Sequence, residues 1–114
     1  MLLTEEKHDQ IAVLCIDGRI DPGTSPEFEA ALLGMIQRGE RSVVLDFAKV
    51  DYISSAGLRV LLIGAKKMKD CQGSICLAAL QTSIKDVLAV TGFMNLFRLF
   101  KSKESAVLEL TANP

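Results

Sequence analysis

The chain has 114 residues, of which 49% are apolar and 24% are charged, and its formal net charge at pH 7 is −1. This length and composition are typical of one globular domain, which we expect to span residues 1–114. The small net charge gives no basic footprint for nucleic acid, and the apolar runs are too short for direct membrane insertion. Three cysteines without a Cys-x-x-Cys spacing favour reduced thiols and a cytoplasmic location.

Two strand-like segments open the chain. Residues 2–8 and 11–17 are strand-like, and the turn at residues 8–10 between them predicts a hairpin. The sequence Asp21-Pro22-Gly23 then indicates a turn before the first helix.

The first helix is predicted to begin near residues 24–25. Thr24 with Glu27 matches a capping box, whereas Ser25 followed by Pro26 matches a cap with proline at the first helical position. Both starts fit the sequence. Apolar residues at helical spacing then form the expected buried stripe, which comprises Phe28, Ala31, Leu32 and Met35.

From residue 42 onward, strand-like and helix-like segments alternate. The expected strands are 42–47, 74–79 and 96–100, and the expected helices are 55–70, 83–91 and 103–110. Such alternation implies parallel strands joined by right-handed crossovers. The predicted fold class is therefore α/β, with an N-terminal hairpin, a mixed and mostly parallel sheet, and helices packed on it.

Three loops follow strands that are expected to run in the same direction. Residues 48–53 lead into the helix that begins at Ser54–Ser55, while residues 21–24 and 80–82 follow two other strands. Loops at the carboxyl ends of parallel strands form the usual binding edge of an α/β sheet. We therefore expect these loops to share one edge.

The helix after the serine pair has an apolar side and a charged side when it is projected at about 100° per residue. The apolar side is expected to be buried and comprises Gly57, Leu58, Val60, Leu61, Leu62, Ala65 and Met68. Gly57 and Gly64 predict a close approach to the sheet, because glycine costs about 1 kcal/mol in a helix interior. Ile63 interrupts the charged side beside Arg59 and Lys67, and we expect it to be exposed.

Ser54 and Ser55 differ in their predicted orientation. Ser54 fits the capping residue, whereas Ser55 projects toward solvent. A helix N-terminus favours an anion by about 0.3–1 kcal/mol, so it would accommodate a phosphate on Ser55. That phosphate would add nearly two negative charges to the surface. Most serines at such positions act only as caps, so the position alone assigns no function.

Enzyme signatures are missing from the sequence, which has no Gly-x-Ser-x-Gly elbow, phosphate-cradling glycine loop or paired metal-ligand motif. The single histidine, His8, lies in the first hairpin and is a poor partner for a catalytic serine. We therefore expect no enzyme, no catalytic residue, no cofactor and no metal. The alternative, a nucleotide-binding or hydrolytic domain, is tested by incubation with GTP or ATP and a product assay.

The stretch Val50-Asp51-Tyr52-Ile53-Ser54-Ser55-Ala56-Gly57-Leu58 strongly resembles the STAS domain family, the fold of sulphate-transporter and anti-sigma-factor-antagonist domains. Gly18-Arg19-Ile20-Asp21 and the segment from Gly92 to Phe97 extend the resemblance over nearly the whole chain. The free-standing members that it is similar to are bacterial anti-sigma factor antagonists.

The resemblance implies a partner switch controlled by phosphorylation. In the family, an anti-sigma factor serine kinase modifies a serine two residues before the glycine, which is Ser55 here, with Ser54 as the alternative. The unphosphorylated antagonist binds that kinase and frees the sigma factor, and a phosphoserine phosphatase resets the switch. Together with the helix projection, this predicts a partner surface that comprises Asp21, Thr24, Ser54, Ala56, Arg59 and Ile63.

A second function within the same family stays open. A STAS subunit of a lipid-transport ATPase or of a stress-sensing complex would use the same fold and surface. Co-purification of a soluble histidine-kinase-like ATPase favours the antagonist, and co-purification of a membrane transporter favours the subunit.

Overall fold

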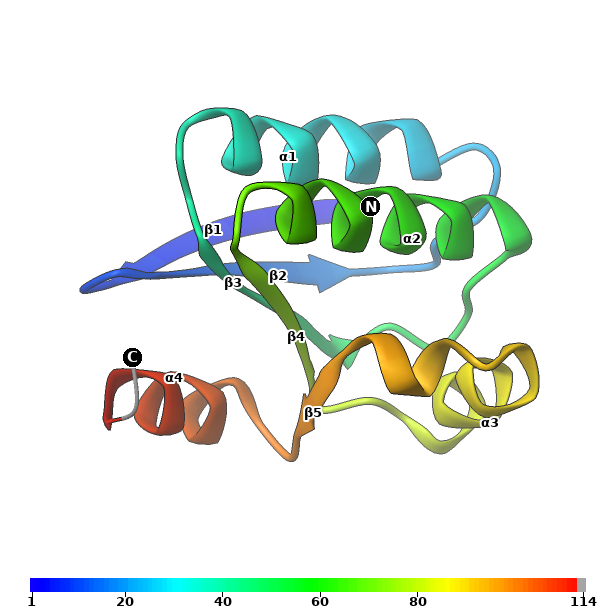
Figure 1. The fold of residues 1–114 in the computed structure, drawn as a ribbon. Helices are drawn as coiled ribbons and strands as arrows, with labels where there is room; N and C mark the ends of the chain where they lie inside the picture. The colour runs from blue at the N-terminus through cyan, green and yellow to red at the C-terminus, as the bar shows by residue number, and fades with distance from the viewer. Residues whose placement is uncertain (113–114) are drawn as a thin grey trace.

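The computed structural model describes residues 1–112, so Asn113 and Pro114 of the predicted domain lie outside the described part. Within it, one five-stranded sheet has the order β1-β2-β3-β4-β5 (Figure 1). β1 pairs antiparallel with β2, and the other neighbours are parallel. The strands are β1 Leu2–His8, β2 Ile11–Asp17, β3 Ser42–Lys49, β4 Ser74–Ala78 and β5 Arg98–Phe100. The predicted mixed, mostly parallel sheet is confirmed.

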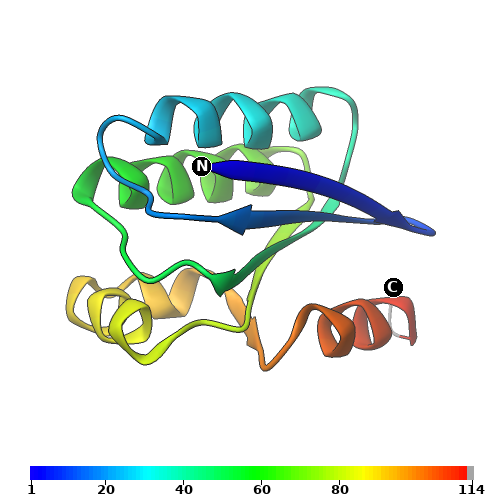
Figure 2. The same cartoon turned by 180° about the vertical axis from the view of Figure 1, so that it is seen from behind.

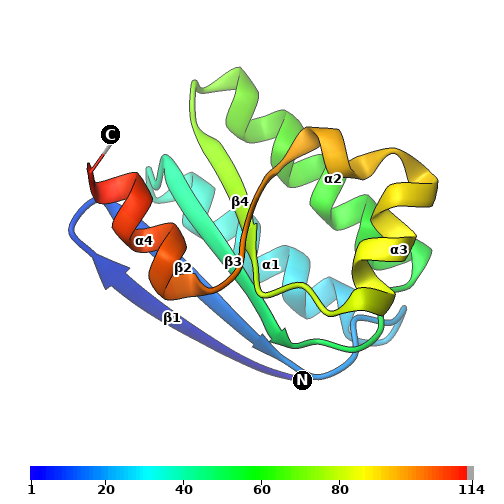
Figure 3. The ribbon, with the colours of Figure 1, turned by 90° about the horizontal axis from the view of Figure 1, so that it is seen from below.

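Helices cover both faces of this sheet. The α-helices are α1 Ser25–Gln37, α2 Ser55–Asp70, α3 Thr82–Thr91 and α4 Lys103–Ala112, and η1 Phe93–Leu96 is a 3-10 turn. α1 and α2 lie side by side on one face, and α4 covers the other (Figures 1 and 2). α3 lies beside the carboxyl ends of the strands, close to the start of α2 (Figure 3).

The apolar residues of the strands alternate between these two layers, as the pleat of a strand requires. Leu14 and Leu45 point into the larger core beneath α1 and α2, whereas Val13 and Val44 point toward α4. A strand buried on both faces explains the continuous apolar run at 43–45 in the sequence.

The last part of the chain differs from the prediction. The predicted strand 96–100 is shortened to Arg98–Phe100, because Phe93–Leu96 forms a 3-10 turn. Gly92, with φ of 80°, ends α3 in the left-handed conformation that glycine adopts without strain. Pairing of β5 with β4 therefore covers only Cys76–Ala78.

The start of α1 also differs from both predicted caps. Thr24 is the N-cap residue, but its side chain makes no capping bond, so the capping box with Glu27 is wrong. Its Oγ1 instead accepts from the Asp21 N–H at 2.9 Å and donates to the Arg19 carbonyl at 2.7 Å. Ser25, the alternative cap, is the first residue of the helix. The Thr24 hydroxyl thus fixes the preceding loop.

An ion pair joins α4 to the edge strand β1. Lys103 Nζ donates to Glu6 Oε2 at 2.7 Å, and His8 Nε2 lies 3.0 Å from Glu6 Oε1. The hydrogen bond from Lys103 is the main cause that lowers the pKa of Glu6 from 4.5 to about 2.

The Glu6 carboxylate should make stability depend on pH. Its folded pKa lies below its unfolded value, so its contribution is present above about pH 4.5 and is lost as the pH falls toward 2. In urea melts between pH 5 and pH 3, Glu6→Gln should therefore lose less stability than the wild type. The pair is partly exposed, which limits the difference to about 1 kcal/mol. A wild-type profile for Glu6→Gln would contradict the assignment.

Candidate functional site

Three loops meet at the carboxyl edge of β2, β3 and β4, as the sequence predicts. Ile20 and Ile53 form an isolated parallel bridge, and the Ser54 N–H donates to the Ile20 carbonyl at 2.8 Å. The loop after β4 is joined to the end of β3 by a hydrogen bond in which Gln81 Nε2 donates to the Ala48 carbonyl at 3.1 Å. These bonds hold the loop after β2 directly beside the start of α2.

The two serines have the orientations that the helix projection predicts. Ser54 is the N-cap of α2 in an extended conformation, is only 8% exposed, and accepts from the Gly57 N–H at 3.3 Å. Ser55, the first residue of the helix, is exposed. Ala56 behind it is half-buried. The Ser54 hydroxyl is therefore committed to the helix, while the Ser55 hydroxyl is accessible to a reagent.

Gly57 is the close contact between α2 and the loops. A Cβ at this position would lie 2.5 Å from Ile20 Cγ2 and 2.7 Å from Ile53 Cγ1. A Cβ at Gly64 would lie 2.7 Å from Leu32 Cδ2 of α1 and 3.2 Å from Ile75 Cδ1 of β4. The predicted close approach to the sheet is confirmed for Gly64, which faces β4 as well as α1, whereas Gly57 lies against the two loops instead. Gly57 lets α2 begin against the bridge that holds the two loops.

Asp21 fixes the turn that precedes α1. Its Oδ1 accepts from the N–H groups of Gly23 and Thr24, at 2.9 Å in both cases. The bond from the Thr24 backbone is the main cause that lowers the pKa of Asp21. The edge therefore carries a permanent negative charge at neutral pH, held in place by the turn.

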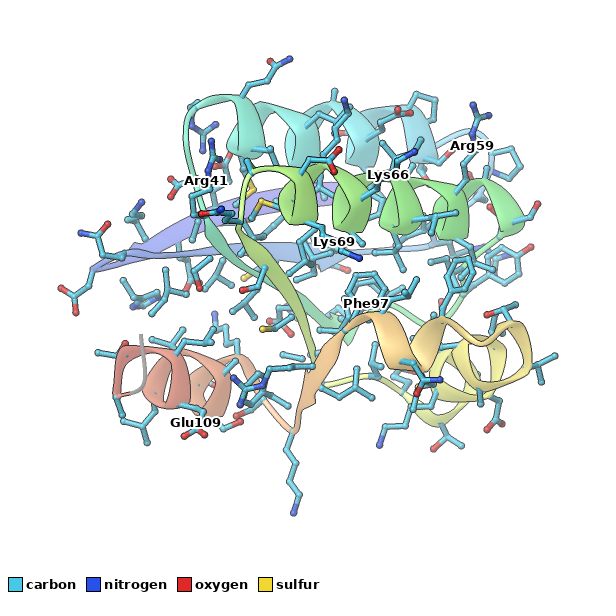
Figure 4. The ribbon with its side chains drawn as sticks, viewed as in Figure 1. Arg41, Arg59, Lys66, Lys69, Phe97 and Glu109 are labelled. Carbon is cyan, nitrogen blue, oxygen red and sulfur yellow. The ribbon has the colours of Figure 1, made fainter. Side chains whose placement is uncertain are left out.

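The outer side of α2 corrects two predictions. Ile63 is half-buried instead of exposed, and Leu62, predicted to be buried, is 44% exposed. Ile63 lies one turn before Lys67, which lines a hollow with Leu33 and Ile36 of α1, so this flank of α2 faces α1. Leu62 lies on the opposite flank, toward β5, which is too short to cover it. Arg59 is exposed near the start of the helix (Figure 4).

Sequence reasoning missed a cationic group at this edge. The Arg19 guanidinium carbon lies 4.1 Å from the centroid of the Tyr52 ring, and Tyr52 is 39% exposed. A cation–π contact of this kind contributes about 0.5–1 kcal/mol at an exposed site. The sequence indicates this contact only indirectly. Arg19 directly precedes Ile20, Tyr52 directly precedes Ile53, and the two isoleucines form the bridge between the loops.

The edge thus combines an accessible hydroxyl, a fixed carboxylate and an aromatic–guanidinium pair. Within residues 1–112, no group of three His, Cys, Asp or Glu residues is placed to hold a metal ion. In the same part of the chain, no helix has both the length and the apolar character needed to cross a bilayer. Fold and edge define a small α/β domain with an exposed serine at a helix start.

Comparison with known proteins places the chain in a family. The STAS domain model matches residues 3–106, so the chain belongs to the STAS domain family, as the motif predicted. A Bordetella bronchiseptica protein named as an anti-sigma factor antagonist, BtrV, is 39% identical over 106 residues, which cover 93% of this chain and 91% of that protein.

Solved structures show the same fold. An anti-sigma factor antagonist from Mycobacterium paratuberculosis has a TM-score of 0.85 at 24% identity, covering 95% of this chain and 92% of that one. Unphosphorylated SpoIIAA, also an anti-sigma factor antagonist, has a TM-score of 0.78 at 14% identity, covering 99% of this chain and 100% of that one.

Proposed function

We propose that this chain is an anti-sigma factor antagonist that acts as a phosphorylation-controlled partner switch. With Ser55 unphosphorylated, it binds an anti-sigma factor serine kinase, and the sigma factor is released. The observation that carries the proposal is the pair of serines, because Ser54 caps α2 and leaves Ser55 as an exposed hydroxyl at the helix start. The relative named BtrV supports the same function.

The fold supports a role as a carrier of phosphate. SpoIIAA has been solved in unphosphorylated and phosphorylated forms, and its two structures match this chain with TM-scores of 0.78 and 0.77. The fold of that protein is therefore kept when it carries phosphate. The start of α2 offers this chain the same tolerance, because a helix N-terminus favours an anion.

In the proposed reaction this chain is the acceptor. Ser55 Oγ attacks the γ-phosphorus of ATP held by the kinase, loses its proton and forms the phosphoester, and ADP leaves. A phosphoserine phosphatase then uses water to return serine and inorganic phosphate. The chain supplies no catalytic group in either step and acts as a non-enzymatic single domain. The three free thiols, Cys15, Cys71 and Cys76, support a cytoplasmic setting.

The proposed contact surface surrounds Ser55 on the loop edge. It includes the turn of Asp21 and Thr24, the start of α2 at Ser54 and Ala56, and the exposed Arg59 one turn along the helix. Ile63 belongs at most to its margin, because that side chain is half-buried on the flank toward α1.

Phosphate should be found on Ser55 and not on Ser54. After incubation with the cognate kinase and ATP, peptide mass spectrometry should localise one phosphate to Ser55, because the Ser54 hydroxyl is buried and bonded to Gly57. Ser55→Ala should abolish labelling, and the matched variant Ser54→Ala should keep it. Labelling that survives Ser55→Ala and disappears in Ser54→Ala would reverse the assignment.

A further inference from the structure

An apolar groove lies between the second half of α2 and the β4–β5 edge of the sheet. Leu62 and Ala65 from α2, Ile75 from β4 and Leu96 from η1 contribute its apolar surface. Leu62 is 44% exposed and Leu96 is 48% exposed. Large apolar side chains that are exposed together around a groove are typical of an interaction site.

The groove exists because the edge strand is short. β5 pairs with β4 only over Cys76–Ala78, so Ser74 and Ile75 of β4 lie before the start of β5 and have no partner in it. The chain before β5 forms η1, which brings Leu96 to the groove.

The rim of this groove is basic. Lys66, Lys69 and Arg98 line it, and no acidic residue of the described chain does so. Within residues 1–112, Lys66 and Lys69 are exposed and form no ion pair, whereas Arg98 Nη2 lies 3.6 Å from Glu109 Oε1. Figure 4 shows Lys69 on the side of α2 that faces Phe97 and β5. At least these two cations at the groove therefore have no ion-pair partner within residues 1–112.

We propose that this groove binds an acidic, leucine-bearing peptide segment of a second protein, other than the kinase. Apolar side chains of the segment contact Leu62 and Leu96, while its carboxylates pair with Lys66 and Lys69. An apolar centre with a charged rim is the usual anatomy of a protein interface, and complementary charge selects the partner. The apolar surface of the groove favours a peptide over a nucleic acid, whose affinity comes mainly from phosphate contacts.

The groove begins one turn beyond Arg59 of the proposed kinase surface. Leu62 and Lys66 follow Ser55 by 7 and 11 residues in the same helix, which places them about 10 and about 16 Å along the axis at 1.5 Å per residue. A short segment in the groove leaves the loop edge around Ser55 uncovered. The domain would therefore hold two partners at once, and groove binding would not depend on the state of Ser55.

The test is a titration of the labelled full chain with a synthetic peptide, followed by NMR. The probe is a short N-acetylated peptide with glutamates and leucines separated by serines, and its control has lysine in place of glutamate. Saturable shifts should centre on Leu62, Lys69 and Leu96, with the acidic peptide binding at least tenfold more tightly than the basic one. Added salt should weaken the binding.

Variants separate the groove from other surfaces. Leu62→Asp and Lys69→Glu should each weaken peptide binding at least tenfold with melting temperatures close to the wild-type value, because both side chains are exposed. Leu108→Asp on α4, where Leu108 is 73% exposed, and Lys67→Glu on the α1 flank should bind as the wild type does. Ser55→Asp should also bind the peptide normally, so a failure here is distinct from a failure of the kinase switch.

Four results would overturn the inference. The first is equal affinity for the basic peptide, and the second is binding that Leu62→Asp and Lys69→Glu leave unchanged. The third is tighter binding of a short single-stranded oligonucleotide at the same residues, which would assign the basic rim to nucleic acid. The fourth is self-association in sedimentation experiments that Leu62→Asp abolishes, which would make a second copy of this chain the occupant.

Discussion

Replacing Gly57 with leucine is expected to lower the free energy of unfolding by about 1–3 kcal/mol, the usual cost of overpacking a core. A Cβ alone at this position would lie 2.5 Å from Ile20 Cγ2 and 2.7 Å from Ile53 Cγ1. Ile20 is fully buried and Ile53 is 5% exposed, so neither side chain has free space to move into. Leucine would therefore push the start of α2 away from the bridge between the two loops.

The matched control is Gly34→Leu on α1. Nothing lies within 4 Å of a Cβ built at Gly34, so leucine there should be neutral or stabilising by up to about 1 kcal/mol through its better helix propensity. Urea melts of the two variants measure the difference directly. Equal stability of Gly57→Leu and wild type would show that α2 begins farther from the loops than the structure places it.

The strands and helices were predictable where local pattern and burial agree. α2 begins and ends at the predicted residues, Ser55 and Asp70, because a serine cap, helical periodicity and a terminal basic turn all indicate the same element. The parallel direction of β3, β4 and β5 followed from the alternation of elements. Periodicity did not indicate the 3-10 turn at Phe93–Leu96, which left β5 shorter than predicted.

The predicted exposure of a side chain was wrong where it depends on the size of the neighbouring element that covers it. A helical projection gives the angle of a residue but not the width of the element that covers it. Ile63 and Leu62 lie on opposite flanks of α2, and only the first faces a long helix, α1. The predicted exposed fraction was therefore too large for Ile63 and too small for Leu62. The same limit applies to Thr24, whose hydroxyl bonds across the loop to Arg19.

The position of the candidate site was predictable from the sequence, but the predicted set of site residues was incomplete. Asp21 and the serine pair were expected at one edge, and the Ile20–Ile53 bridge brings their loops together. The contact of Arg19 with Tyr52 needed the register between two loops, which the sequence does not carry. Long-range pairing, more than residue type, was the missing information.

Phosphorylation of Ser55 is expected to weaken binding of the anti-sigma factor kinase at least tenfold, which corresponds to about 1.4 kcal/mol. The phosphate adds nearly two negative charges beside Arg59 and resists the desolvation that an interface requires. The fold itself should be kept, because the start of α2 favours an anion. Titration calorimetry with phosphorylated and unphosphorylated chain measures the first effect, and thermal melts should differ by only a few degrees.

Three variants separate the charge from the capping role of the serine pair. Arg59→Glu should weaken kinase binding mainly by slowing association and by making it less dependent on salt. The substitution removes a cation of the proposed kinase surface and leaves Ser55 unchanged. Ser54→Ala should lose about 1 kcal/mol of stability with its cap to Gly57. Ser55→Ala should keep both stability and kinase binding while it blocks phosphorylation. If phosphorylated chain binds the kinase as tightly as Ser55→Ala does, the switch does not act through this surface. A loss of folding on phosphorylation would instead mean that the Ser55 side chain is packed in solution and not exposed.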